Sequence, residues 1–147
     1  MTKEIIITGA AGFLGSKFSK FFADTGYKVI GIDKNKKKLK SIESENIVTI
    51  CADITNEKEV SQIHTFLKKK YNICGLINNA AIDAVPSKTS LTNLRYPSLA
   101  TWNIEINVSI IGTFLMTKYF GELMIKKKNG SIINIGSDLS FIVPNQK

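Results

Sequence analysis

A glycine-rich stretch near the N-terminus has the composition of a phosphate-binding turn. The apolar run at residues 5–7 predicts a buried strand, and a helical pattern of large apolar residues begins a few residues later. Glycines between a strand and a helix permit a tight turn and a close approach to a pyrophosphate, which the N-terminus of the helix then stabilises. We therefore predict a dinucleotide-binding loop; glycines that serve only the turn are the alternative. The residues assigned to it are Thr8, Gly9, Ala11, Gly12, Phe13, Leu14 and Gly15.

Asp33 is the second candidate, because it ends the next predicted strand 18 residues after Gly15. An acid about 20 residues beyond such glycines commonly binds the adenosine ribose of a dinucleotide. A carboxylate accepts hydrogen bonds from a 2′-hydroxyl and repels a 2′-phosphate, so NAD(H) is the predicted cofactor. The neighbouring Lys34 and Lys36 attract phosphate and soften this preference, which leaves NADP(H) as the alternative.

Ser137 is a third candidate, since it follows the apolar run at residues 132–135. A hydroxyl where a buried strand meets a loop is well placed to bind a substrate, and a turn-forming serine is the alternative. Cys51 and Cys74 lie in apolar runs and are expected to be reduced core residues. His64 shares a helical pattern with apolar residues and is expected to be partly exposed. These residues supply too few ligands for a metal site.

The composition is that of an ordinary globular domain. The chain has 147 residues, of which 44% are hydrophobic and 22% charged, so residues 1–147 are expected to form one domain. No apolar stretch approaches about 18–20 residues, and the N-terminus lacks the layout of a signal peptide. We therefore expect no membrane span and a cytoplasmic location.

The net charge of +8 raises the alternative of a nucleic-acid binder. The charge comes largely from lysine runs at residues 34–38, 68–70 and 126–128. The last two runs close predicted helices, where cations complement the helix dipole. Arginine, the usual reader of base edges, occurs only as Arg95. We expect solvated helix faces and no nucleic-acid partner.

Strand patterns alternate with helical patterns along the chain. Strands are predicted at residues 4–8, 28–33, 47–51, 74–78 and 131–135, with helices from Phe13, over 35–45, after Asn56 and over 99–128. A polar stretch at 83–98 is predicted to be a long loop. Because the strands are apolar on both faces, they predict a parallel sheet covered by helices on both sides. The expected fold is a doubly wound α/β (Rossmann) sheet in the order 3-2-1-4-5.

With these elements in place, the sequence resembles the short-chain dehydrogenase/reductase family over essentially its whole length. Asp53, in the sequence CADIT, matches the family's aspartate beside the adenine ring, and Ile54 follows it. The run NNAA ends the fourth predicted strand and matches the motif that lies along the cofactor. The resemblance therefore implies that Asp53, Ile54, Asn79, Ala80 and Ala81 contribute to cofactor binding.

The same resemblance implies a reaction. Asn107 matches the asparagine that bends the long helix and supports a catalytic water, and Ser137 matches the serine that orients the substrate. The implied activity is hydride transfer between nicotinamide and a small-molecule carbonyl or alcohol. A fainter resemblance, to flagellin-modification and surface-sugar oxidoreductases, implies a sugar or sugar-nucleotide substrate. It rests on NNAAID, LTNLRYPSLATW and SDLSFIVPNQ.

Two departures from the family pattern limit these expectations. Two residues separate the first two glycines of the loop, a spacing more typical of the family's extended branch. The family's catalytic Tyr-x-x-x-Lys is absent, because Tyr71, Tyr96 and Tyr119 are followed four positions later by glycine, alanine and leucine. We interpret the chain as the N-terminal part of a longer fold, truncated after the fifth strand and inactive alone. A non-catalytic dinucleotide-binding module or a truncated remnant is the alternative.

The interpretation as a partial fold also predicts self-association, and a homo-oligomer is expected. The outer edge of the fifth strand would lack a neighbour, and some apolar residues of the long helix would lack their partners. The residues concerned are Phe114, Leu115, Tyr119 and Phe120.

Overall fold

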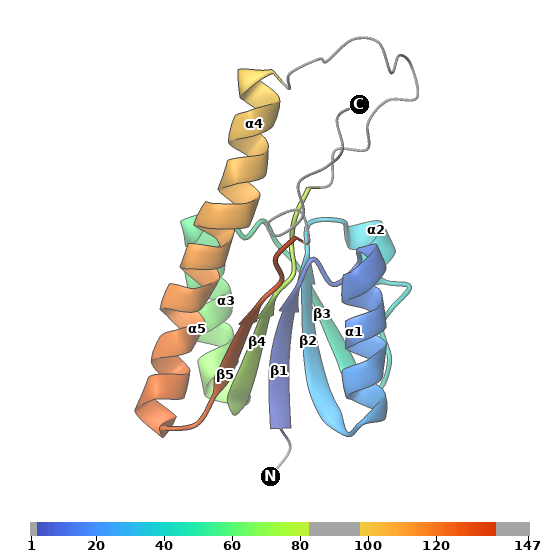
Figure 1. The fold of residues 1–147 in the computed structure, drawn as a ribbon. Coiled ribbons are helices and arrows are strands. Elements are labelled where there is room, and N and C mark those ends of the chain that lie inside the picture. Colours follow the sequence, from blue (N-terminus) through green and yellow to red (C-terminus); the bar gives the residue numbers. More distant parts are fainter. Residues whose placement is uncertain (1–2, 83–97, 138–147) are drawn as a thin grey trace.

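A five-stranded parallel sheet forms the centre of the molecule (Figure 1). The computed structural model describes residues 3–82 and 98–137. The strands are β1 (Lys3–Thr8), β2 (Tyr27–Asp33), β3 (Ile47–Cys51), β4 (Ile73–Asn78) and β5 (Ser131–Asn134). Their spatial order is β3-β2-β1-β4-β5, and all pairings between these strands are parallel. The predicted doubly wound order is confirmed.

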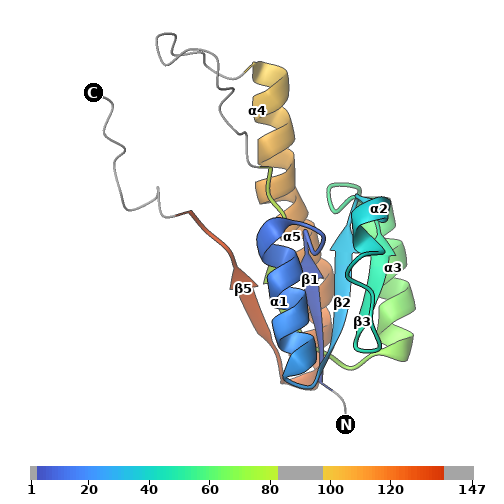
Figure 2. The ribbon, with the colours of Figure 1, turned by 90° about the vertical axis from the view of Figure 1, so that its right-hand side faces the viewer.

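Helices cover both faces of the sheet. They are α1 (Phe13–Asp24), α2 (Lys36–Leu39), α3 (Glu57–Lys70), α4 (Leu99–Ile106) and α5 (Thr113–Lys127), with the π-helical segment η1 (Asn107–Gly112) between the last two. α1 lies on one face, and α3 and α5 lie side by side on the other (Figure 2). α4 extends the line of α5 past the carboxyl ends of the strands (Figure 1). The predicted loop at 83–98 lies outside the described residues except for Ser98.

Local capping explains where three helices begin. The side chains of Asn35, Asn56 and Ser98 each accept a backbone N–H from the first turn of the helix that follows. Such side chains satisfy N–H groups that have no partner within the helix. The helix predicted after Asn56 therefore begins directly after that residue, which is its N-cap.

The helix expected over residues 35–45 is much shorter than predicted. α2 begins at Lys36 and ends at Leu39. The hydroxyl of Ser41 donates to the carbonyl oxygen of Lys38 at 2.7 Å. Serine side chains that bond to the nearby backbone compete with helix propagation. The four lysines between positions 36 and 40 add like-charge repulsion over so short a segment.

The long helical pattern over 99–128 forms, with an interruption. From Asn107 to Gly112 the hydrogen bonding is π-helical, so the bend expected at Asn107 coincides with the start of η1. Residues 99–127 together are long and apolar enough, by length and composition, to cross a membrane, contrary to the expectation from sequence. The core helix of a soluble protein passes the same test, and α5 packs against α3 and β4.

The buried core has two parts, one on each face of the sheet. On the face of α3 and α5 it includes Ile6, Ile30, Leu76, Met116 and Phe120, and on the face of α1 it includes Ile5, Ile7, Val29 and Ile77. The helical spacing of large apolar residues marks the buried face of α1 only in part, since Phe18 and Phe22 are half-buried against this core. That helix buries Gly15, Ser19 and Ala23, whereas Phe13 is 79% exposed and Phe21 61% exposed.

Several predicted environments are wrong. Cys51 is exposed because β3 is an edge strand, while Cys74 is half-buried; both thiols are free, as predicted. His64 is buried, not partly exposed, because α5 packs over it. Leu115 and Phe120 are also buried, since both face the sheet and α3 instead of lacking partners. Phe114 is exposed, and the expected self-association stays a prediction.

Candidate cofactor site

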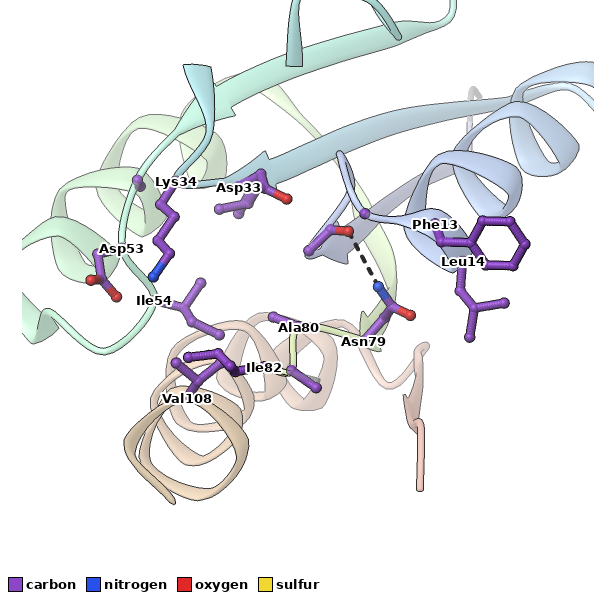
Figure 3. Close-up of a pocket in the computed structure, with 15 residues that line it drawn as sticks. Phe13, Leu14, Asp33, Lys34, Asp53, Ile54, Asn79, Ala80, Ile82 and Val108 are labelled. Carbon is purple, nitrogen blue, oxygen red and sulfur yellow. Dashed lines mark hydrogen bonds between the residues drawn. The ribbon is translucent and has the colours of Figure 1, made fainter. Parts of the chain in front are cut away.

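A pocket of about 360 Å³ opens at the carboxyl ends of β1, β2, β3 and β4. Ligands of doubly wound sheets bind at this edge, where the strand order reverses. Figure 3 shows Phe13 and Leu14 at one end of the pocket and Lys34 and Asp53 at the other. The lining consists of Gly9, Gly12, Phe13, Leu14, Ile32, Asp33, Lys34, Ala52, Asp53, Ile54, Asn79, Ala80, Ala81, Ile82 and Val108.

The turn after β1 is built around two glycines. Gly9 has a φ of +64°, and a Cβ atom there would lie 2.8 Å from Cα of Ala80. A Cβ atom at Gly15 would lie 2.1 Å from the carbonyl oxygen of Gly9, so α1 approaches the turn more closely than any side chain allows. Gly12, Phe13 and Leu14 at the start of α1 line the pocket, so the N-terminus of this helix lies at the pocket wall, a position that favours an anion.

Asp33 connects the end of β2 to this turn. One carboxylate oxygen accepts the backbone N–H of Ala11 at 3.0 Å, and the other accepts that of Asn35 at 2.8 Å. Each carboxylate oxygen can accept more than one hydrogen bond, so Asp33 keeps acceptor capacity toward the pocket. Lys34 follows it and points toward Ile54 (Figure 3).

Thr8 and Asn79 join the ends of β1 and β4 beneath the pocket. The Thr8 hydroxyl accepts the backbone N–H groups of Asn79 and Ala80, both at 3.1 Å. The Asn79 side-chain amide donates to the carbonyl oxygen of Thr8 at 3.0 Å and to that of Gly9 at 3.3 Å. Figure 3 shows the bond from Asn79 to the turn as a dashed line. The Asn79 side chain therefore ties the residue after β4 to the start of the turn, where the Gly9 carbonyl oxygen also accepts the backbone N–H of Gly12 at 3.0 Å.

Asp53 forms the far end of the pocket. One of its carboxylate oxygens accepts from the backbone N–H of Thr55 at 2.9 Å and from the Thr55 hydroxyl at 2.7 Å. Ile54 is 6% exposed and presents an apolar side chain beside Val108 of η1 (Figure 3). An acid next to flat apolar surface suits a ring that carries an exocyclic amine.

The two predicted catalytic residues lie apart from this lining. Asn107 is an exposed residue at the start of η1, and Ser137 is exposed beyond the end of β5. Among the described residues that line the pocket, η1 is represented by Val108 and not by Asn107. Their assigned roles in proton transfer and substrate orientation therefore stay predictions.

The structure brings most of the predicted cofactor residues together. Eleven of them line the pocket, whereas Thr8, Ala11 and Gly15 lie behind it and shape the turn. Four lining residues were not predicted from the sequence, namely Ile32, Ala52, Ile82 and Val108. Three of these are chain neighbours of predicted residues. Their apolar side chains resemble ordinary core residues, so only their place next to Asp33, Asp53 and Ala81 was a signal.

The sheet order and the glycine turn at its switch point define a Rossmann-type α/β protein. Residues 3–146 match the family model described as short chain dehydrogenase, and the chain belongs to this family. It is 29% identical over 144 residues to dehydrogenase/reductase SDR family member 6 of Rattus norvegicus, covering 95% of this chain and 54% of the relative. The chain therefore spans about half the length of the curated relatives that it matches.

Two bacterial relatives share a named activity. The chain is 35% identical to 3-oxoacyl-(acyl-carrier-protein) reductase FabG of Buchnera aphidicola, covering 96% of this chain and 58% of that protein. A crystal structure of 3-ketoacyl-(acyl-carrier-protein) reductase from Brucella melitensis, complexed with NADH, superimposes with a TM-score of 0.77 at 27% identity. That match covers 94% of this chain and 58% of the other.

Proposed function

We propose that this chain binds NAD(H) in the pocket at the ends of β1 to β4. The carrying observation is that Asp33 is held at the end of β2 by Ala11 and Asn35, with its carboxylate at the pocket wall. The turn over residues 9–15 would hold the pyrophosphate, and Asp33 the adenosine ribose. Asp53 and Ile54 would hold the adenine ring.

The chain's residues fit such a dinucleotide. A Cβ atom at Gly9 or Gly15 would meet backbone at 2.8 or 2.1 Å, so the close-packed turn is available only to glycine. The cavity of about 360 Å³ falls within the range of small-molecule sites. When bound, the nicotinamide supplies or accepts a hydride. The residues of this chain bind and orient the two halves of the dinucleotide.

The proposed reaction is hydride transfer to or from a carbonyl or alcohol carbon. The named activities of the reductases among its relatives support this class of reaction. In it, Ser137 would hydrogen-bond the reacting oxygen and Asn107 would support proton supply. A sugar or sugar-nucleotide substrate stays a prediction. A dinucleotide-binding module without catalysis uses the same pocket, and the absence of Tyr-x-x-x-Lys from the sequence favours it for these 147 residues.

The test of this proposal is the selectivity between NADH and NADPH. Both dinucleotides are titrated calorimetrically into the wild-type chain, Asp33→Ala and Asp33→Asn. Wild type is expected to prefer NADH, because the carboxylate accepts from a 2′-hydroxyl and repels a 2′-phosphate. Both variants should narrow or reverse the preference. Asp33→Asn removes the charge but keeps an acceptor for the Ala11 N–H. It therefore separates the effect of the charge on selectivity from the effect of the hydrogen bond to the turn.

Asp24→Ala is the matched control, since it removes an exposed carboxylate at the far end of α1. It should leave both affinities unchanged. If the ratio of NADH affinity to NADPH affinity is equal for wild type and Asp33→Ala, Asp33 does not contact the ribose. No saturable binding of either dinucleotide to folded wild type would refute the cofactor site itself.

A further inference from the structure

The first turn of α3 holds a carboxylate in an unusual capping arrangement. Asn56 is the N-cap, and its side-chain oxygen accepts the backbone N–H of Glu59 at 3.4 Å. In a common capping box the acid three residues along returns a bond to the N–H of the cap residue. Here one oxygen of Glu59 accepts the Asn56 side-chain amide at 2.9 Å. The other reaches further back and accepts the backbone N–H of Asp53, also at 2.9 Å.

This second bond lands on a residue of the pocket wall. Asp53 lines the pocket, whereas Glu59 is absent from its described lining. The carbonyl oxygen of Asp53 accepts the N–H of Asn56 at 3.1 Å, and its carboxylate accepts from Thr55. The Glu59 bond completes this set by fixing the N–H side of the Asp53 peptide. Both sides of Asp53 are thus anchored to the start of α3.

Ile54 is held from the opposite direction. A Cβ atom at Gly112 of η1 would lie 2.6 Å from Cδ1 of Ile54, so the long helix packs directly on this side chain. The segment Asp53-Ile54 therefore sits between α3 and η1. Because the segment is contacted from both sides, it is held in place at the wall of the pocket.

We infer that Glu59 is a positioning residue that orients Asp53 at the adenine end of the cofactor pocket. The inference rests on the proposed function and deepens it. A carboxylate that accepts a backbone N–H makes a charge-assisted bond, stronger than one between neutral groups. Removing it would leave the Asp53 N–H without this acceptor, so the Asp53 peptide would be held at the wall only by its contacts with Thr55 and Asn56.

Glu57 provides a matched control on the same helix. Both acids lie in the first turn of α3, so both interact favourably with the positive end of the helix dipole. Glu57 accepts instead from the Lys118 ammonium at 2.9 Å and the Tyr119 hydroxyl at 3.1 Å. A comparison of the two positions therefore separates orientation of Asp53 from a general effect on the helix.

The experiment measures NADH and AMP binding by calorimetry for wild type, Glu59→Ala, Glu59→Gln and Glu57→Ala. Glu59→Ala should weaken both ligands about tenfold, the loss expected for one charge-assisted bond. AMP is informative because it carries adenine without nicotinamide. Glu59→Gln retains one acceptor oxygen and should recover part of the affinity. Glu57→Ala should weaken NADH and AMP binding less than about twofold. In thermal unfolding it should destabilise the protein about as much as Glu59→Ala does.

The outcomes distinguish this inference from the proposed function. If wild type binds NADH but Glu59→Ala and Glu57→Ala bind it and AMP equally well, Glu59 has only a capping role and the inference is overturned. If Glu59→Ala does not fold, Glu59→Gln decides, because NADH and AMP affinities equal to wild type would contradict the inference. Failure of wild type to bind NADH overturns both proposals.

Discussion

The hydroxyl of Thr8 accepts the backbone N–H of Asn79 at 3.1 Å, which joins the last residue of β1 to the residue after β4. β1 and β4 are the neighbouring strands at the switch point of the sheet, where the strand order reverses. The same hydroxyl accepts from Ala80 and donates to the carbonyl oxygen of Ile77 at 3.4 Å. One side chain therefore sets the separation of the two strands at the pocket floor.

Replacing Thr8 with valine should be clearly destabilising although the volume is conserved. Thr8 is 1% exposed, and Thr8→Val leaves two backbone N–H groups without their acceptor. We expect a loss of about 1–3 kcal/mol in the free energy of unfolding, measured by chemical denaturation. Thr8→Ser retains the hydroxyl and should lose less. Equal stabilities for valine and threonine at this position would show that the hydroxyl network contributes nothing.

Gly15→Ala should impair both folding and cofactor binding. The added Cβ atom would lie 2.1 Å from the Gly9 carbonyl oxygen and 2.8 Å from its carbonyl carbon, so backbone must move. Overpacking of this kind costs about 1–3 kcal/mol, and it displaces the turn that faces the pocket. Gly136→Ala is the control, because among the described residues no atom beyond the two chain neighbours lies within 4 Å of a Cβ atom there. NADH affinity and thermal unfolding should change at position 15 and stay constant at position 136.

His64 should make stability depend on pH. Burial between α3 and α5 and the nearby charge of Lys68 lower its pKa below the ordinary value of 6.5, with Lys126 adding to the effect and Glu122 opposing it. Because the unfolded chain binds the proton more tightly, stability is full above about pH 6.5 and falls as pH drops below it. Within residues 3–82 and 98–137 the Nε2 atom of His64 has no hydrogen-bond partner, so protonation gains no compensating bond there.

The check is the free energy of unfolding between about pH 5 and 7 for wild type and His64→Phe. Phenylalanine keeps a ring next to Tyr119 and Phe120, which lie 5.6 and 5.8 Å from the His64 ring centroid. The slope with pH should be smaller in the variant. An identical slope in both proteins would contradict a buried, neutral His64.

The 147-residue chain should bind a dinucleotide without appreciable turnover. None of its four tyrosines is followed by lysine four residues later, so the proton donor that the resemblance implies is absent. Loss of positioned acid–base catalysis costs about 10²–10⁴-fold in rate. A serine hydroxyl such as that of Ser137 is a poor acid and a poor base at neutral pH. NAD(H)-linked absorbance with carbonyl and alcohol substrates is the measurement, and robust turnover would refute this expectation.

Strand positions and sheet order could be predicted because they depend on local patterns with few competing readings. The runs at 47–51 and 74–78 are apolar and end at turn signals, and the right-handed crossover rule then limits the order. Burial of single residues was harder to predict. Cys51 belongs to an apolar run and yet is exposed on an edge strand, whereas Phe120 lies close to charged residues in the sequence and yet is buried in the core. Only the packed structure distinguishes them.

Some residues of the candidate site could likewise be predicted from the sequence, and others could not. Asp33 and the glycines were identifiable because strand, turn and helix fix their chemistry locally. Glu59 was not, since its effect depends on a bond to Asp53 six residues earlier and not on contact with the pocket. Val108 was not either, because the register of η1 decides which residue of the long helix meets Ile54.

The most direct test of the cofactor site is backbone-amide NMR of the 147-residue chain during titration with NADH. We expect saturable shifts in the amides of residues 9–15, Asp33, Asp53, Ile54 and 79–81, which shape the pocket. The chemical shifts of the amides around the hollow between α5 and β5, such as those of Gly121 and Ile132, should not change. Saturable shifts confined to that hollow, or no saturable shifts at millimolar NADH, would contradict the proposed site.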